Sequence, residues 1–265
     1  MTIKVSHESP ICLLEQSLSY NTFDYALVHL LDKHPEYYNF FRRSLLLNRE
    51  VLLDNSIFEL GKAFDSKKYA EWVLKLTPTY YIVPDVLEDS EATMHSYMDF
   101  NEAYNNLPGL RIGAVQGKTY QEISDCYKFM VDCADYVAIS FDFSYYQYTG
   151  KGHNKHEKMM SGRQRLIQNL IDDGTWCWEK PVHLLGCSLP QEFSFYVKEN
   201  IYNIRSLDTS NPIMAGVTGL KYSGDLGLKT KPVGLLADHL DVNLSDDQKH
   251  LINYNIASFK SIINH

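Results

Sequence analysis

The sequence predicts an α/β protein of the (β/α)8 class, a TIM-like barrel that occupies residues 1–265 as a single domain. Three observations favour this fold. Short β-rich runs alternate with helical patterns along the chain, which is typical of βα units and a parallel sheet. A length of 265 residues suits one such barrel. The alternative, an open doubly wound sheet, normally carries a glycine-rich turn after its first strand, and the sequence shows none there.

The strands are predicted from runs rich in the β-branched and aromatic residues that strands favour. Six runs stand out: VLLDN (51–55), YYIVPDV (80–86), RIGAVQG (111–117), YVAISFD (136–142), VHLLGCS (182–188) and NIRSLD (203–208). A first strand is placed at PICLLEQ (10–16). The eighth is left open between IMAGV (213–217) and GLKYS (219–223).

Helical patterns fill the intervals between these runs. In SKKYAEWVLKL (66–76), four apolar side chains share one face of a helix: Tyr69, Trp72, Val73 and Leu76. The segment 245–263 begins with a serine and two acids, which suits an N-cap and a first helical turn. Further helices are predicted over residues 88–104, 118–134, 158–174 and 189–200.

The composition indicates a globular protein, with 45% hydrophobic and 22% charged residues. No signal-peptide pattern and no run of about 18 apolar residues is present, so we expect no membrane association and a cytoplasmic location. The five cysteines lack metal-binding spacings and are expected to be reduced, buried thiols. A net charge of −8 argues against broad non-specific nucleic-acid binding but allows a local basic groove.

Polar residues stand at the carboxyl ends of the predicted strands. They include Asp54, Asp85, Gln116, Ser140 and Asp208. An aspartate at a strand end often caps the next helix, so each one alone has a structural alternative. In a barrel enzyme, however, the strand ends and the loops after them build the site. Several carboxylates and a glutamine at equivalent positions therefore favour a functional site.

Converging carboxylates suit chemistry at the anomeric carbon of a sugar. One carboxylate attacks as a nucleophile, while another transfers the proton of the leaving group. A glutamine side chain offers both a donor and an acceptor, which suits the edge of a planar base. The sequence thus points to glycosyl transfer or hydrolysis.

The order of the motifs resembles that of the tRNA-guanine transglycosylases, and more closely that of the short phage DNA-guanine transglycosylases, the DpdA family. No single motif is specific, but five occur in the family's order over about residues 50–216. They are LLDNSIFELG, IVPDVLED, GAVQG, HLLGCSLPQEF and SLDTSNP. The resemblance implies a (β/α)8 barrel, in agreement with the strand count.

The resemblance also implies a reaction and a set of site residues. Asp208 would attack C1′ of a guanosine-type nucleotide in DNA and form a covalent glycosyl-aspartate, with Asp54 as the proton shuttle. The incoming base would be a 7-deazaguanine of the preQ0 or preQ1 type, as in queuosine-related modification. The implied base-binding residues are Asp85, Gln116, Gly117, Phe58, Ser140 and Gly186. No metal or cofactor is implied, and the target guanine must be flipped out or single-stranded.

The sequence departs from the tRNA enzymes in two places, and both departures affect the substrate that we expect. No cysteine follows Cys187, so the zinc subdomain that those enzymes carry after the nucleophile is missing. Ser-Phe-Asp-Phe-Ser (140–144) replaces their glycine-rich base-reading turn. The first departure favours the compact DNA-acting relatives, and the second leaves the incoming base open.

Nucleic-acid contact is predicted at YYQYTGKGHNKHEK (145–158), which mixes positive charge with tyrosines. The expected contacts are Lys151, Lys155, Lys158 and Tyr146, which suit phosphates and stacked bases. The alternative is a mobile, solvated loop. Lys229 and Lys231 are expected in a solvated surface, and His183 is expected to be a satisfied interior histidine rather than a catalytic one.

Three other functions remain open at this stage. The chain could act on tRNA or another RNA instead of DNA, or it could be a barrel glycosidase acting on nucleosides or free sugars. A non-catalytic nucleic-acid-binding barrel is the third, and the acidic net charge disfavours it. The oligomeric state is also open.

Overall fold

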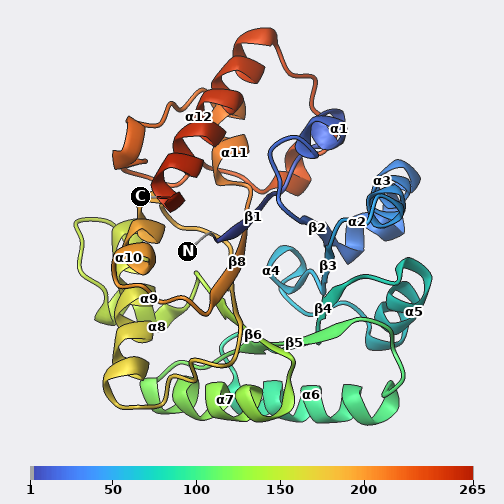
Figure 1. Ribbon diagram of the computed structural model, residues 1–265, viewed down its shortest axis with the longest axis vertical. Coiled ribbons are helices and arrows are strands. Elements are labelled where there is room, and N and C mark those ends of the chain that lie inside the picture. The colour runs from blue at the N-terminus through green and yellow to red at the C-terminus, as the bar shows by residue number, and fades with distance from the viewer. Residues whose placement is uncertain (1–2, 265) are drawn as a thin grey trace. The chain divides into compact units, whose positions relative to one another are not determined.

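The computed structural model describes residues 3–264 (Figure 1). Its strands form one parallel sheet in the order β1-β8-β7-β6-β5-β4-β3-β2. The strands are β1 (Lys4–His7), β2 (Asp24–Leu27), β3 (Val51–Asp54), β4 (Tyr80–Ile82), β5 (Leu110–Val115), β6 (Tyr136–Ser140), β7 (Val182–Leu185) and β8 (Ile204–Thr209). Strands that follow one another in sequence are neighbours from β2 to β8, and β1 lies next to β8. Eight parallel strands alternating with helices confirm the (β/α)8 fold class.

Helices fill the connections. They are α1 (Leu14–Ser17), α2 (Val28–Lys33), α3 (Pro35–Leu46), α4 (Ile57–Leu60), α5 (Ser66–Leu76), α6 (Ser90–Ala103), α7 (Tyr120–Cys133), α8 (Ser144–Thr149), α9 (Lys155–Asp172), α10 (Phe193–Lys198), α11 (Asn211–Val217) and α12 (Asp246–Asn264). Short 3-10 turns are η1 (Ile11–Leu13), η2 (Pro190–Glu192), η3 (Gly224–Leu226) and η4 (Leu236–His239). The predicted serine cap of the last helix is confirmed, because Ser245 Oγ accepts from Gln248 N at 3.2 Å.

The six central strands lie where they were predicted, but the outer two predictions are wrong. Residues 10–16 form η1 and the start of α1 after Pro10, and residues 213–217 lie in α11, which has Pro212 in its first turn. The true outer strands are β1 and β2. They are four residues long and almost wholly buried, so they show no alternation of polar and apolar residues.

The chain divides into two compact units. We call residues 1–22 with 140–265 the terminal unit and residues 23–139 the central unit. In the terminal unit, α12 packs beside α11 (Figure 1). A β-carbon on Gly216 would lie 2.3 Å from Ile252 Cγ1, so glycine permits this close approach. In the central unit, α6 and α7 are neighbours, and Tyr69 of α5 donates a hydrogen bond to the carbonyl of Leu53 at 2.9 Å.

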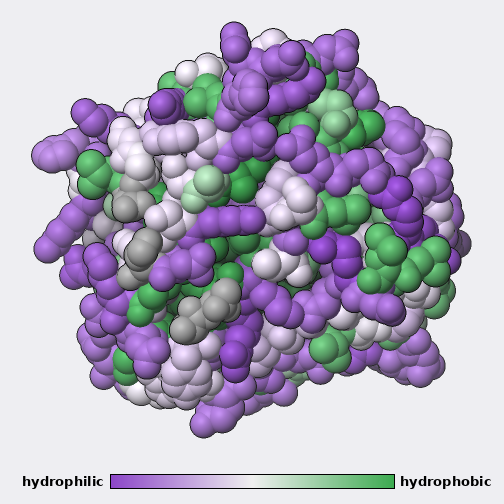
Figure 2. Space-filling model, turned by 45° about the horizontal axis from the view of Figure 1, so that its top comes forward, coloured by the Kyte–Doolittle hydropathy of each residue, from purple (hydrophilic) through white to green (hydrophobic). Residues whose placement is uncertain are grey.

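On the face that Figure 2 displays, hydrophilic residues predominate and hydrophobic ones form small groups between them. Among the helices in residues 3–264, none combines the length and the apolar character that crossing a bilayer requires. All five cysteines are free. Cys126 and Cys187 are buried as expected, whereas Cys12 and Cys133 are exposed, which corrects the expectation of uniformly buried thiols.

His7 at the end of β1 is buried without hydrogen bonds to its ring. Neither ring nitrogen has a partner among the described residues, and the ring packs edge-on against Phe259 at 5.3 Å between centroids. Burial, with a smaller contribution from Lys260, lowers the pKa of His7 from 6.5 to about 3. Charging this imidazole in the folded protein is therefore unfavourable.

We expect His7 to make the protein less stable in acid. Between about pH 6.5 and 3 the unfolded chain protonates this histidine while the folded chain does not, so the free energy of unfolding falls with pH by up to about 1.4 kcal/mol per unit. His7→Phe should flatten that slope in denaturant unfolding at pH 7, 6 and 5. His250→Phe, at an exposed position of α12, is the control. Parallel pH profiles for wild type and His7→Phe would refute this account.

Candidate active site

Asp208 lies near the end of β8 in the terminal unit and is 4% exposed. Its Oδ1 accepts two hydrogen bonds, from His183 Nε2 at 3.0 Å and from the backbone N–H of Gly186 at 3.2 Å. Its Oδ2 accepts no hydrogen bond from any residue that the structure describes. One carboxylate oxygen is thus held by two donors, and the other by none within the described residues.

His183 on β7 is fully buried and bonded through both ring nitrogens. Nδ1 lies 2.8 Å from Ser206 Oγ, and Nε2 faces Asp208. The prediction of a satisfied interior histidine is confirmed. Its Nε2 partner is nevertheless Asp208, the predicted nucleophile. His183 therefore contacts the candidate site, although the sequence predicted only a structural role for it. Ser206 and Asp208 lie two positions apart on β8 and therefore share a face, and His183 pairs with Ser206 in register.

Gly186 follows β7 and adopts a conformation that favours glycine. Its φ is +63°, and a β-carbon there would lie 2.4 Å from Cδ1 of Phe141. The phenyl ring of Phe141 therefore packs directly against this residue. Its N–H donates to Asp208, so the predicted site residue Gly186 does contact the predicted nucleophile.

A side-chain hydrogen bond closes the turn that follows Asp208. Asn211 N donates to Thr209 Oγ1 at 2.9 Å, and Pro212 stands in the first turn of α11. Tyr222 then donates from its hydroxyl to Asn211 Oδ1 at 2.6 Å. Strand β8 cannot continue past this point, which fixes Asp208 near its end.

Asp54 ends β3 in the central unit and is buried. Its Oδ2 accepts from the Tyr25 hydroxyl at 2.7 Å, and its Oδ1 accepts from Ser56 N at 2.5 Å. Tyr25 comes from β2, which pairs with β3 so that Leu27 lies opposite Asp54. Tyr25 was not predicted, because strand β2 itself was missed.

Asp85 and Gln116 come together, as their strand-end positions suggested. Asp85 accepts from Gln116 Nε2 at 2.7 Å and from Asn55 Nδ2 at 2.8 Å. Gln116 Oε1 in turn accepts from the backbone N–H of Glu88 at 2.9 Å. Burial raises the pKa of Asp85, and the hydrogen bonds from Asn55 and Gln116 partly oppose that shift.

The other predicted base-binding residues have varied surroundings. Gly117 approaches α7 closely, since a β-carbon there would lie 2.9 Å from Ile123 N. Phe58 lies on α4 and is 40% exposed. In the terminal unit, Ser140 Oγ accepts from Asp142 N at 3.3 Å, and its carbonyl accepts from the Tyr146 hydroxyl at 3.1 Å.

The segment predicted to contact nucleic acid needs two corrections. Residues 145–158 are not a single loop, because α8 covers its first part and α9 begins at Lys155. Tyr146 is fully buried and stacked on Phe143, so it cannot stack on a base, whereas Tyr148 is 88% exposed. Lys151 and Lys155 are exposed and Lys158 is half-buried, so their predicted role stays a prediction.

Lys231 is not the solvated surface residue that the sequence suggested. Its ammonium lies 3.8 Å from the centre of the Phe141 ring, which is the ring that packs on Gly186. Burial lowers the pKa of Lys231, while nearby acidic groups that include Asp142 and Asp208 oppose the shift. Lys231 and Asp208 therefore lie close enough to interact electrostatically.

Within residues 3–264, no cluster of three or more His, Cys, Asp or Glu side chains at ligand spacing contains Asp54, Asp85 or Asp208. Each of these carboxylates instead accepts hydrogen bonds from neutral or imidazole donors. Such an arrangement suits acid–base and nucleophilic chemistry.

Comparison with known protein families gives no match, and comparison with curated proteins gives none either. Among solved structures, the chain is similar to a mandelate racemase/muconate lactonizing enzyme-like protein from Rubrobacter xylanophilus, with a TM-score of 0.52 and 14% identity over 88% of this chain. A second such protein, from Rubrobacter xylanophilus DSM 9941, has a TM-score of 0.44 and 10% identity, and covers 75% of this chain and 48% of its own.

The chain spans 60% of the length of the first of these structures. At 14% identity the likeness concerns the fold alone, and it agrees with the (β/α)8 class read from the strand order. The resemblance to the transglycosylases therefore stays a prediction carried by the motifs.

Proposed function

We propose that this chain is a glycosyl-transfer enzyme that exchanges a purine base through a covalent glycosyl-aspartate on Asp208. One observation carries the proposal. The Asp208 carboxylate is buried and held through Oδ1 by His183 and Gly186, whereas Oδ2 accepts no hydrogen bond within the described residues. A carboxylate fixed at one oxygen and open at the other suits attack on an anomeric carbon.

In the first half of the proposed reaction, Asp208 Oδ2 attacks C1′ as the bond from C1′ to N9 of the departing guanine breaks. The electron pair of that bond stays on the base, which takes a proton. In the second half, an incoming base loses its proton and attacks C1′ through N9, releasing Asp208. Two inversions give net retention at C1′.

The central unit supplies the groups that we assign to the base. Asp54, which accepts from the Tyr25 hydroxyl, is the proposed proton shuttle. Asp85 and Gln116 are the proposed readers of the purine edge, supported by their mutual hydrogen bond and burial. Phe58 is the proposed stacking residue, supported by its exposure.

The finer assignment is replacement of guanine in DNA by a 7-deazaguanine. Its support is the order of the five motifs and the absence of cysteines after Cys187. Lys151 and Lys155 are exposed and suit contact with a phosphate backbone.

The test is a base-exchange assay on the purified chain. A single-stranded DNA oligonucleotide and an RNA of the same sequence are each incubated with radiolabelled guanine, and p-nitrophenyl glycosides are supplied in parallel. We expect label in the DNA and none in the glycoside reaction. Label only in RNA would keep the chemistry and correct the polymer, whereas glycoside hydrolysis without label in either polymer would overturn the proposal.

A further inference from the structure

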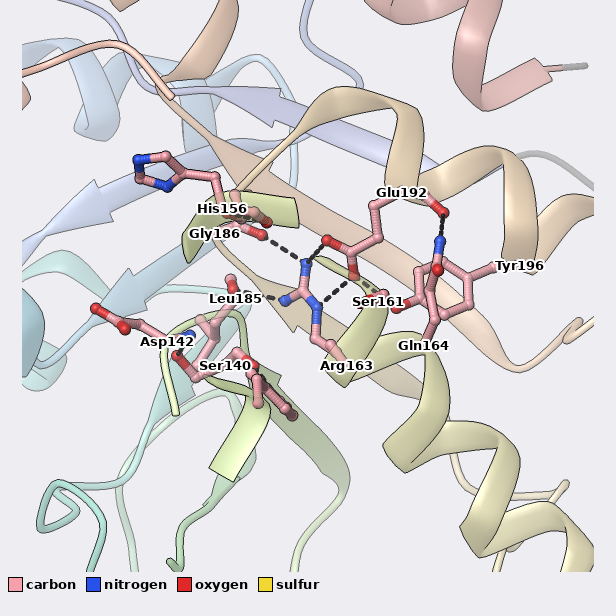
Figure 3. Close-up of polar contacts among 12 residues, drawn as sticks. Ser140, Asp142, His156, Ser161, Arg163, Gln164, Leu185, Gly186, Glu192 and Tyr196 are labelled. Carbon is pink, nitrogen blue, oxygen red and sulfur yellow. Dashed lines mark hydrogen bonds and ion pairs between the residues drawn. The ribbon is translucent and has the colours of Figure 1, made fainter. Parts of the chain in front are cut away.

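Arg163 of α9 and Glu192 of η2 form a fully buried ion pair in the terminal unit (Figure 3). Arg163 Nε donates to Glu192 Oε1 at 2.6 Å, and Nη2 donates to Oε2 at 3.1 Å. The Tyr196 hydroxyl donates to Glu192 Oε1 at 2.6 Å, and Gln164 Nε2 donates to the Glu192 carbonyl at 3.0 Å. The carboxylate is thus neutralised and surrounded by donors.

The far edge of the Arg163 guanidinium holds the end of β7. Nη1 donates to the carbonyl of Leu185 at 2.9 Å, and Nη2 donates to the carbonyl of Gly186 at 3.0 Å (Figure 3). A guanidinium presents five donors in a fixed plane, so it can serve the carboxylate and both carbonyls at once. The ammonium of a lysine has only three donors, all on one nitrogen, so it cannot reproduce this arrangement.

These bonds lead directly to the nucleophile. Gly186, whose carbonyl accepts from Arg163, donates its own backbone N–H to Asp208 Oδ1. The Phe141 ring packs against the α-carbon of Gly186, and the backbone N–H of Phe141 also donates to the Leu185 carbonyl at 3.0 Å. Gly186 is therefore bonded to Arg163 and packed against Phe141 while its N–H donates to Asp208.

We propose that Arg163 is a positioning residue that aims the Gly186 N–H at Asp208 and so fixes the attacking carboxylate. The inference rests on the proposed function, because it assigns a purpose to the orientation of Asp208. Removing two charges from water is costly, and a buried ion pair adds little to stability compared with a well-packed apolar pair. The positioning of Gly186 gives this ion pair a function other than stabilising the fold.

The variant that tests the proposal is Arg163→Lys, which keeps the charge but loses the planar set of donors. We expect kcat for base exchange, and the rate of covalent adduct formation, to fall about 10- to 100-fold. KM should stay within about twofold, because the residues assigned to the base are unchanged. The Gly186 amide proton should exchange faster with solvent in the variant, as measured by NMR, since its carbonyl and N–H are less firmly held.

The matched control is Arg49→Lys in the central unit. Arg49 also makes a two-point contact with a buried carboxylate, donating to Asp24 from Nε at 2.7 Å and from Nη2 at 3.0 Å. Asp24 begins β2, at the opposite end of the strand from the residue that pairs with Asp54. Arg49→Lys should lower thermal stability while leaving kcat and the Gly186 amide unchanged.

The outcomes separate this inference from the proposed function. Unchanged kcat and unchanged Gly186 exchange in Arg163→Lys would overturn the positioning role, even if wild type exchanges bases. If wild type shows no exchange, the proposed function fails, and the Gly186 amide still reports whether Arg163 holds that peptide. Should Arg163→Lys not fold, Phe141→Leu loosens the other side of Gly186, and an unaltered kcat there would count against the proposal.

Discussion

Asp208→Asn is expected to abolish both base exchange and the covalent adduct, with a loss on the order of 10⁴-fold or more in kcat. An asparagine oriented with its oxygen at the Oδ1 position still accepts from His183 and Gly186. Its amide nitrogen then replaces Oδ2, and an amide nitrogen is a poor nucleophile for an anomeric carbon. The substitution thus removes the attacking atom and keeps the hydrogen bonds that hold the side chain.

Two measurements check this prediction. Denaturing electrophoresis with a labelled oligonucleotide should show a protein–DNA adduct for wild type and none for Asp208→Asn, while thermal unfolding should be similar for both. Asp172→Asn is the control, because Asp172 is exposed in the last turn of α9. Retention of the adduct by Asp208→Asn would show that another residue is the nucleophile. Equal loss in Asp172→Asn would show that the assay responds to general damage.

The fold was largely predictable because its central strands have a strong compositional signal. Runs such as 51–55 and 136–142 are short and largely apolar, and β3 and β6 lie within them. The prediction of the outer strands failed for a physical reason. In β2 all four residues are buried, including Asp24, whose charge is met by Arg49. A charged residue does not predict a buried strand unless the ion-pair partner that compensates its charge is known.

The site was predictable at strand ends and not beyond them. Asp54, Asp85 and Asp208 were found because each lies at or near the carboxyl end of a recognisable strand. His183 was assigned to the interior correctly, but its contact with Asp208 depends on the pairing of β7 with β8, which sequence spacing does not give. Arg163 lies in the middle of a helix, where an arginine ordinarily faces solvent. Its burial depends on Glu192, which is distant in the sequence.

Tyr146 was wrongly predicted to be an exposed, base-stacking residue. Its neighbours are tyrosines, a glycine-rich stretch and lysines, so the local composition indicated an exposed loop. The residue instead lies in α8 and faces α9, where a β-carbon on Gly162 would lie 2.4 Å from Tyr146 Cβ. The small residue on the partner helix, rather than anything near the tyrosine, determines that it is buried.

Arg163→Met should lower the free energy of unfolding by about 3–5 kcal/mol, the largest stability effect that we expect from a single substitution here. Both side chains of the pair are fully buried, so the variant leaves the Glu192 carboxylate buried without a cation. The carbonyls of Leu185 and Gly186 each lose the Arg163 donor as well, although the Leu185 carbonyl keeps the bond from the Phe141 N–H. Denaturant unfolding at pH 7 measures the loss.

The double variant Arg163→Met/Glu192→Leu distinguishes the loss of a favourable bond from the cost of a stranded charge. If the stranded carboxylate dominates, the double variant should recover most of the stability lost by Arg163→Met, because apolar replacements of a buried pair are often neutral or stabilising. Lys249→Met, which breaks the exposed contact with Asp246 at 3.4 Å, should cost no more than about 1 kcal/mol. A double variant no more stable than Arg163→Met would show instead that the bonds to Leu185 and Gly186 carry the stability. Even in a recovered double variant, slow adduct formation is expected, because the double variant restores no Arg163 donor to the carbonyls of Leu185 and Gly186.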